Sequence, residues 1–190
     1  IEVPHRYFPH PPPASTDPIT FHGGAVMSGT SHLYIIWYGP WTSAAQTSRR
    51  SLHTEFVQHL DGTWWSINKG YTGKGGAAIG DAPVLTKELI DKGSVGVSQL
   101  TDSAITKVVQ RALDRKQLPV DAKGIYMVLT SSTVSKVGFL TQYCGWHTYT
   151  TVGTTAIKYS FVGNPGSNTA CAMQATSPNG NAGADAMASI

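Results

Sequence analysis

The sequence predicts an α/β fold, in which a mixed, largely parallel sheet is flanked by two main helices. Three observations support this fold class. Two uninterrupted runs of β-branched and aromatic residues, 33–38 and 125–129, are typical of strands buried on both faces. A segment with an amphipathic helical pattern lies between them, as the crossover between two parallel strands requires. With 190 residues and 41% hydrophobic side chains, the chain can bury a core of its own.

The first predicted strand covers residues 31–39 and ends at Gly39-Pro40. A helix follows, capped by Thr42 or Ser43 and ended by Asp61-Gly62. Its apolar residues recur at helical spacing: Ala45, Leu52, Phe56 and Leu60. The order of strand, turn and helix is the usual beginning of an α/β domain.

The middle of the chain continues the alternation of strands and helices. A strand candidate at 82–89 follows a glycine-rich stretch, and the apolar residues of 95–100 can form one more short strand. Thr101 or Asp102 caps the clearest helix in the chain, and Pro119 prevents its continuation. One face of this helix is apolar and must pack against a core: Ala104, Ile105, Val108, Val109, Ala112 and Leu113.

Three further strands are predicted after this helix. The buried strand 124–130 comes first, and 143–152 and 156–162 then alternate polar and apolar residues, as half-buried strands do. Residues 164–190 are rich in Gly, Asn, Ala and Ser and lack hydrophobic periodicity. We therefore expect an irregular C-terminal third.

Residues 1–18 contain six prolines. Because proline removes amide donors and fixes an extended backbone, this segment is predicted to be an extended arm outside the single domain formed by 19–190. Val3, Tyr7 and Phe8 are apolar enough to anchor the arm in a groove of the same chain or of a neighbouring subunit. If each arm fills a groove on the next subunit, an open filament results.

Charge and hydropathy exclude several kinds of partner. Charged residues make up 13% of the chain and the net charge is +3, with no basic stripe that could follow a phosphate backbone. The longest apolar run, 33–38, is too short to span a membrane. We therefore predict neither a nucleic-acid partner nor a membrane span. A neutral, hydroxyl-rich surface fits an extracellular protein that meets sugars, a cell wall or copies of itself.

The sequence contains no complete catalytic or cofactor motif. Residues 73–76 lack the spacing of a phosphate-binding loop, no G-x-S-x-G elbow is present, and we predict no cofactor. Trp64 and Trp65 are candidates for stacking on a glycan, but neighbours in an extended segment point to opposite faces, so at most one of them is free. Cys144 and Cys171 permit either one disulfide or, in a reducing compartment, two buried thiols.

Several short strings follow one another along the chain in a fixed order. They are Ile19-Thr20-Phe21-His22-Gly23-Gly24, Tyr34-Ile35-Ile36-Trp37-Tyr38-Gly39, Trp64-Trp65, Gly124-Ile125-Tyr126-Met127-Val128-Leu129-Thr130-Ser131, Cys144-Gly145-Trp146-His147, Phe161-Val162-Gly163-Asn164, Pro178-Asn179-Gly180 and Gly183-Ala184-Asp185-Ala186-Met187. Together they cover 19–190 and resemble the Exordium, or phosphate-induced protein 1, family of secreted plant and algal cell-wall proteins. The ordered set is more specific than any single string.

The resemblance implies a secreted protein of the apoplast or cell surface that is linked to growth and has no well-defined enzymatic activity. Family members usually carry additional cysteines, so here Cys144 and Cys171 become the expected disulfide pair. Family members also continue past the last string into a helix bearing His-Glu-Leu-Ala-Glu, whereas this chain ends at Ile190. A zinc site with His147 as one ligand would depend on that helix, and we expect a structural role for His147 alone.

We therefore predict a non-enzymatic extracellular structural, matrix or cell-surface protein. Its expected partners are copies of itself, through the arm, and cell-wall or surface glycans. The arm resembles the proline and hydroxyl clusters that plant and algal secretory pathways hydroxylate and O-glycosylate: Pro11, Pro12, Pro13, Ser15 and Thr16. The chain opens on Ile1, so we expect that a leader has been removed. Two alternatives stay open, a zinc-metallohydrolase-like domain whose catalytic helix lies beyond residue 190 and a glycan-binding module that uses Trp64 or Trp65.

Overall fold

The computed structural model describes residues 21–24, 26–172, 176–178 and 180–190. Its centre is a five-stranded sheet in the order β2-β1-β3-β5-β4. The strands are β1 (His32–Tyr38), β2 (Val84–Asp91), β3 (Gly124–Thr130), β4 (Gly145–Val152) and β5 (Thr155–Val162). The four strands β2, β1, β3 and β5 run parallel to one another, and β4 runs antiparallel to β5. This arrangement confirms the predicted mixed, largely parallel sheet.

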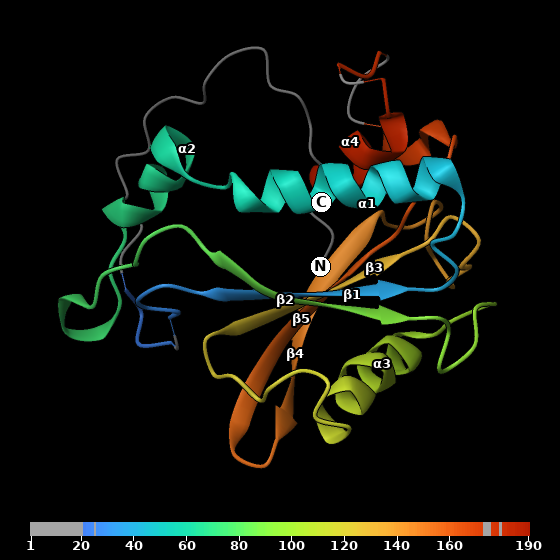
Figure 1. Ribbon diagram of the computed structural model, residues 1–190. Coiled ribbons are helices and arrows are strands. Elements are labelled where there is room, and N and C mark those ends of the chain that lie inside the picture. The colour runs from blue at the N-terminus through green and yellow to red at the C-terminus, as the bar shows by residue number, and fades with distance from the viewer. Residues whose placement is uncertain (1–20, 25, 173–175, 179) are drawn as a thin grey trace.

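Helices cover both faces of the sheet, α1 and α4 on one face and α3 on the other (Figure 1). The helices of the described residues are α1 (Ala44–Gln58), α2 (Gly62–Ser66), α3 (Asp102–Asp114) and α4 (Ala182–Ala188), with the 3-10 turns η1 (Ile67–Gly70), η2 (Lys74–Gly76) and η3 (Thr169–Cys171). The two longest, α1 and α3, are the two main helices that the sequence predicts.

The predicted start signals of the two main helices are caps in the structure. Ser43 Oγ accepts a hydrogen bond from the amide of Gln46 at 3.3 Å. Thr101 Oγ1 accepts one from the amide of Ala104 at 3.2 Å. Each hydroxyl satisfies an amide that has no partner inside its own helix, and this fixes where the helix begins.

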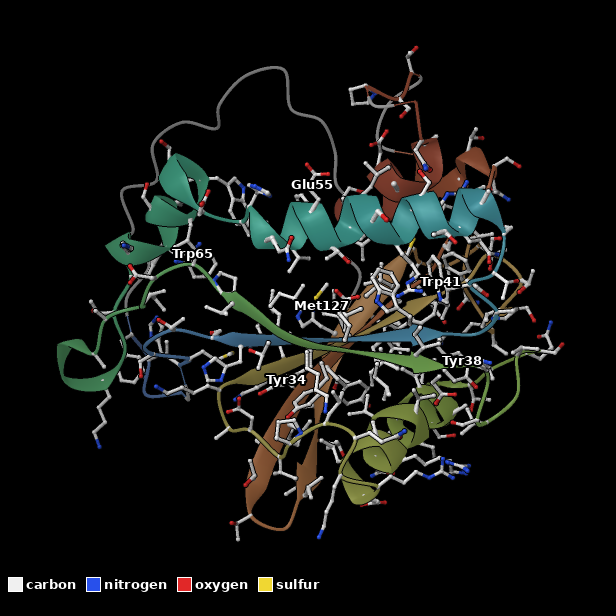
Figure 2. The ribbon with its side chains drawn as sticks, in the orientation of Figure 1. Tyr34, Tyr38, Trp41, Glu55, Trp65 and Met127 are labelled. Atoms are coloured by element: carbon white, nitrogen blue, oxygen red, sulfur yellow. A yellow bond between two sulfur atoms is a disulfide. The ribbon has the colours of Figure 1, made fainter. Side chains whose placement is uncertain are left out.

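The alternation of side chains along β1 supplies two cores. Its even-numbered residues join the core under α3, and its odd-numbered residues join a second core with Val57 of α1 and Met187 of α4. Figure 2 shows Tyr34 on the α3 side of the sheet and Met127 of β3 on the α1 side. All of 33–38 is buried, as expected of an apolar strand that lies between two layers of helices.

Three segments differ from the expectations in detail. Residues 95–100 form isolated bridges rather than a strand, since Gly93 and Gly96 turn the chain with positive φ. Trp64 and Trp65 lie in helix α2 and not in an extended segment. The described part of 164–190 contains no strand, as predicted, but it holds η3 and also α4, whose sequence of small residues carries no apolar periodicity.

Candidate functional site

The carboxyl ends of parallel strands are where sheets of this kind bind ligands, at the point where the strand order reverses. The chain passes from β1 to β2 on one side and then to β3 on the other, so this point lies between the ends of β1 and β3. Tyr38 and Trp41 mark this end of β1 in Figure 2. We define the carboxyl-edge cluster as the polar side chains that gather there: Gln46, Arg49, Ser131, Ser132, Thr133 and Asn164.

Arg49 of α1 is the centre of the carboxyl-edge cluster. Its Nη1 donates to Asn164 Oδ1 (2.9 Å), its Nε to Asn181 Oδ1 (2.9 Å) and its Nη2 to the carbonyl of Gly166 (3.3 Å). A Cβ on Gly183 would lie 2.6 Å from Arg49 Cζ, so glycine is needed where α4 approaches the guanidinium. All three acceptors are neutral, and Arg49 belongs to no ion pair within the described residues.

The hydroxyls of the cluster are bonded to neutral groups. Gln46 Nε2 donates to Ser132 Oγ at 3.1 Å, and Ser131 Oγ lies 3.1 Å from Thr133 Oγ1. Neither serine contacts a histidine or a carboxylate in the part of the chain that the structure describes. The described cluster therefore holds no hydroxyl paired with a base, the arrangement that nucleophilic catalysis needs. What it does is join α1 to the loops after β3 and β5.

Four buried polar atoms lack a hydrogen-bond partner among the described residues: Arg50 Nε, His53 Nε2, Trp146 Nε1 and Asn164 Nδ2. His53 of α1 is 3% exposed. Its burial, together with the positive charge of Arg49, lowers the pKa of His53 to about 4, and Asp185 opposes part of this effect. His53 is therefore neutral at neutral pH and packs as a polar core residue.

The sequence predicts no role for the carboxyl-edge cluster. In the sequence, the adjacent residues Arg49 and Arg50 look like two exposed basic residues. The three hydrogen-bond acceptors of Arg49 lie 115 to 132 positions further along the chain. One signal could have found the cluster, because Asn164 and Gly183 both belong to the strings that carry the family resemblance.

Trp64 is the more exposed of the two predicted stacking residues, with 60% of its surface accessible. Trp65 donates its indole N–H to the carbonyl of Gly80 at 3.1 Å. Figure 2 shows Trp65 between α2 and the loop that leads into β2. The hydrogen bond ties α2 to that loop and leaves Trp64 as the ring available to a ligand.

Ile67 lies three residues after Trp64 in one continuous helical stretch, so the two side chains share a side of it. Ile67 is 65% exposed, and Tyr71, which follows the end of η1, is 46% exposed. We call Trp64, Ile67 and Tyr71 the Trp64 platform. The nearby Lys69 Nζ pairs with Asp81 Oδ1 at 3.1 Å, which leaves the rim of the platform close to neutral.

Cys144 and Cys171 form a disulfide with a Cα–Cα distance of 5.6 Å. The bond joins the residue before β4 to the end of η3, so it holds the irregular C-terminal segment against the sheet. The pairing is the one that the family resemblance implied.

His147 lies in β4 with an exposed side chain. Among the described residues, no group of three or more His, Cys, Asp or Glu side chains is placed to hold a metal ion. No helix of these residues is long and apolar enough to cross a membrane. The predicted anchors and modification sites of the arm lie outside the described residues: Val3, Tyr7, Phe8, Pro11, Pro12, Pro13, Ser15 and Thr16.

The fold and the site define a disulfide-linked α/β domain in which Arg49 and neutral polar groups form a hydrogen-bonded cluster at the carboxyl edge. Comparison with known proteins identifies the family to which this domain belongs. Residues 19–190 match the model of the family described as "Phosphate-induced protein 1 conserved region", and the chain belongs to this family. No solved structure matches the chain.

Curated relatives are similar over most of this chain. It is 28% identical to Protein EXORDIUM-like 5 of Arabidopsis thaliana over 90% of its length and 54% of the relative's. It is 29% identical to Protein EXORDIUM-like 3 of the same plant, over 90% and 58%. It is 26% identical to Protein PHOSPHATE-INDUCED 1 of Nicotiana tabacum, over 68% and 41%. The chain thus spans about half the length of these relatives.

Several of the family strings meet around the carboxyl edge. Gly39 ends β1 with a φ of +91°, and a Cβ there would lie 2.7 Å from Ser131 Oγ. Asn164 and Gly183, from two later strings, both lie against Arg49. The packing of the fold therefore accounts for the residue types at these positions.

Proposed function

We propose that this protein is a non-enzymatic structural protein of the extracellular matrix or cell surface, and that it associates with copies of itself through its arm. The observation that carries the proposal is the disulfide between Cys144 and Cys171. Disulfides persist in oxidising compartments and are rare in the cytosol. The family resemblance supports the same location.

The arm supplies the means of association. Residues 1–18 combine six prolines with the apolar anchors Val3, Tyr7 and Phe8. An extended, proline-rich segment loses little conformational entropy when it binds, and its anchors gain by leaving water. Docking of each arm on the next subunit joins unlike surfaces, and such contacts produce filaments when they do not close into a ring.

Mass spectrometry of the native protein under non-reducing conditions tests the location and the modification. Trypsin cleavage after Lys136 and Lys158 separates the two cysteines, so an intact disulfide links the peptide 137–158 to the peptide that begins at Tyr159. We also expect hydroxyproline and O-linked sugar on the peptide that begins at Tyr7. Free thiols and an unmodified arm would contradict the extracellular proposal.

A triple arm variant tests self-association in the full chain. Val3→Ser, Tyr7→Ser and Phe8→Ser remove the anchors and keep every proline. We expect the assemblies formed by the wild-type chain to become much smaller in this variant while its circular dichroism spectrum is unchanged. Equal particle size for variant and wild type would refute assembly through the arm.

The second candidate function is glycan binding at the Trp64 platform. Its exposed indole, a neighbouring tyrosine and a neutral rim fit the apolar face of a sugar better than they fit a charged ligand. Cell-wall oligosaccharides should quench tryptophan fluorescence in the wild type and not in Trp64→Ala. Phe56→Ala, which removes an exposed aromatic side chain of α1, is the matched control. Equal quenching in both variants would argue against the platform.

The zinc-metallohydrolase alternative remains a third hypothesis. It requires ligands on a helix after residue 190, and the curated relatives are about twice as long as this chain. Metal analysis of the longer native protein, with and without a His147→Ala change, tests it. Zinc bound in proportion to protein and lost in the variant would favour the enzyme over the structural proposal.

A further inference from the structure

The two edge strands of the sheet differ in how they are protected against pairing with another strand. Edge strand β2 has three protective features. Pro83 precedes it, a bulge at Thr86 interrupts its register with β1, and charged side chains run along it: Lys87, Glu88 and Asp91. These features make β2 a poor template for a further strand.

The other edge strand, β4, has none of these features. Its eight residues pair with β5 in an unbroken register. Its sequence, GWHTYTTV, contains no proline, lysine or carboxylate and is rich in β-branched and aromatic residues. The nearest charged side chain across the ladder, Lys158 of β5, donates to the carbonyl of Ala122. The β4 edge is therefore neutral and regular.

The hairpin register shows which amides of β4 point outward. A two-residue turn at 153–154 connects Val152 to Thr155, so these two residues form the hydrogen-bonded pair next to the turn. Because hydrogen-bonded and free positions alternate, the amides and carbonyls of His147, Tyr149 and Thr151 face away from β5. Among the described residues, no backbone or side-chain hydrogen bond reaches these groups.

The side chains of these three residues are exposed as well. Trp146 packs into the α3-side core, so the odd-numbered residues of β4 point to the opposite face. That face carries α1 and α4, yet all three side chains are exposed, and Tyr149 is 69% accessible. At Tyr149, therefore, the outward-facing backbone groups and the aromatic ring are both accessible in the described part of the chain.

We propose that β4 pairs antiparallel with β4 of a second copy of this chain, with the two-fold axis beside Tyr149. In this register Tyr149 lies opposite its own copy, Thr148 opposite Thr150 and His147 opposite Thr151. No cross-strand pair contains an aspartate, glutamate, lysine or arginine, and threonine and aromatic pairs of this kind are favourable. The sheets of the two copies become one continuous sheet.

A second copy is favoured over other partners because the strand is complementary to itself. An isologous contact needs a surface without like charges close to its axis, and β4 satisfies this along its whole length. The proposal takes from the proposed function only the idea that the chain associates with itself. It places a two-fold contact on β4, separate from the head-to-tail contact of the arm.

Two substitutions at Tyr149 in the full chain distinguish the contribution of the backbone amide to dimer formation from that of the side chain. Tyr149→Pro removes one outward amide and leaves the ladder to β5 intact, since proline is tolerated where the N–H faces outward. Tyr149→Ala keeps that amide. By light scattering, the dimer dissociation constant should rise about tenfold or more in Tyr149→Pro and much less in Tyr149→Ala. An unchanged constant in Tyr149→Pro would overturn the proposal.

Cross-linking gives an answer that does not depend on the proline variant folding. Tyr149→Cys should form a disulfide-linked dimer under mild oxidation, because residues paired across the axis lie within reach of a disulfide. Lys87→Cys on β2 is the matched control and should form no disulfide-linked dimer. Equal cross-linking of the two variants, or none in Tyr149→Cys, would contradict pairing at β4.

The triple arm variant separates failure of this proposal from failure of the proposed function. If arm contacts alone drive association, the arm variant is monomeric and Tyr149→Pro still assembles. If β4 pairing alone operates, the arm variant still forms dimers and only Tyr149→Pro loses them. When both contacts operate, the arm variant stops at the dimer, whereas Tyr149→Pro still assembles head to tail through its arms and lacks only the two-fold contact.

Discussion

At the scale of single residues, Arg49 shows how one side chain holds distant parts of the chain together. Its guanidinium bonds to the loop after β5 through Asn164 and Gly166, and to the start of α4 through Asn181. A charged donor makes stronger hydrogen bonds than a neutral one, and Asn164 is buried with 2% of its surface exposed. Loss of Arg49 therefore removes three charge-assisted hydrogen bonds at once, one of them to a buried side chain.

We expect Arg49→Ala to lower the free energy of unfolding by roughly 2–4 kcal/mol, because several charge-assisted hydrogen bonds are lost at once. Arg49→Lys keeps the charge but cannot reach three acceptors, so its effect should be intermediate. Lys107→Ala, on the exposed side of α3, is the control and should change stability by no more than about 0.5 kcal/mol. Urea unfolding measures all three. A neutral Arg49→Ala would refute the role given to this residue.

His53 gives the protein a defined sensitivity to acid. Its folded-state pKa of about 4 lies below the ordinary value of 6.5, so the unfolded chain binds the proton more readily. The stability that the neutral side chain contributes is complete above pH 6.5 and is lost as the pH falls toward 4. A shift of this size corresponds to at most about 3 kcal/mol.

His53→Gln should therefore flatten the fall in stability between pH 6.5 and pH 4 that the wild type shows, since glutamine does not titrate. His59→Gln is the matched control, because His59 is exposed on the same stretch of chain. Urea unfolding at several pH values provides the comparison. If His53→Gln and His59→Gln gave the same slope as the wild type, the buried histidine would not be the source of the acid sensitivity.

At the scale of elements, the disulfide fixes the geometry of the edge strand. It joins the residue before β4 to η3 across a separation of 27 residues. A loop of this length corresponds to about 3–4 kcal/mol in the chain-entropy model. The same bond holds the segment after β5 close to the carboxyl-edge cluster.

The double change Cys144→Ser and Cys171→Ser should lower the unfolding free energy by about 3–4 kcal/mol, since the unfolded chain regains the freedom that the bond removes. Reduction of the wild type by dithiothreitol should produce the same shift in the urea midpoint. The double variant should no longer respond to dithiothreitol, which is the internal control. A wild type insensitive to the reductant would show that the bond is absent in solution.

The sequence predicts some helices and strands of this fold better than others. The strands β1 and β3 and the helix α3 carry strong hydrophobic patterns, and these patterns report burial directly. Helix α4 carries none, because it packs through small residues that come close to Arg49. The carboxyl-edge cluster was not predictable, since its hydrogen bonds join residues that only the folded topology brings together.

At the scale of the whole molecule, the features that could bind partners lie in separate places. The Trp64 platform is in α2 and η1, and the unprotected strand β4 forms the edge of the sheet opposite β2 (Figure 1). The contact proposed for the arm belongs to residues 1–18, which lie outside the described residues. The carboxyl-edge cluster is used for packing. This distribution suits a building block that makes several contacts at once, and it is what we propose for the protein.

Sedimentation velocity of the native protein over about a hundredfold range of concentration tests self-association most directly. We predict that the weight-average sedimentation coefficient rises with concentration toward that of elongated assemblies, and that the triple arm variant stops at the dimer. A single monomeric boundary at every concentration, the same for wild type and variant, would contradict the account.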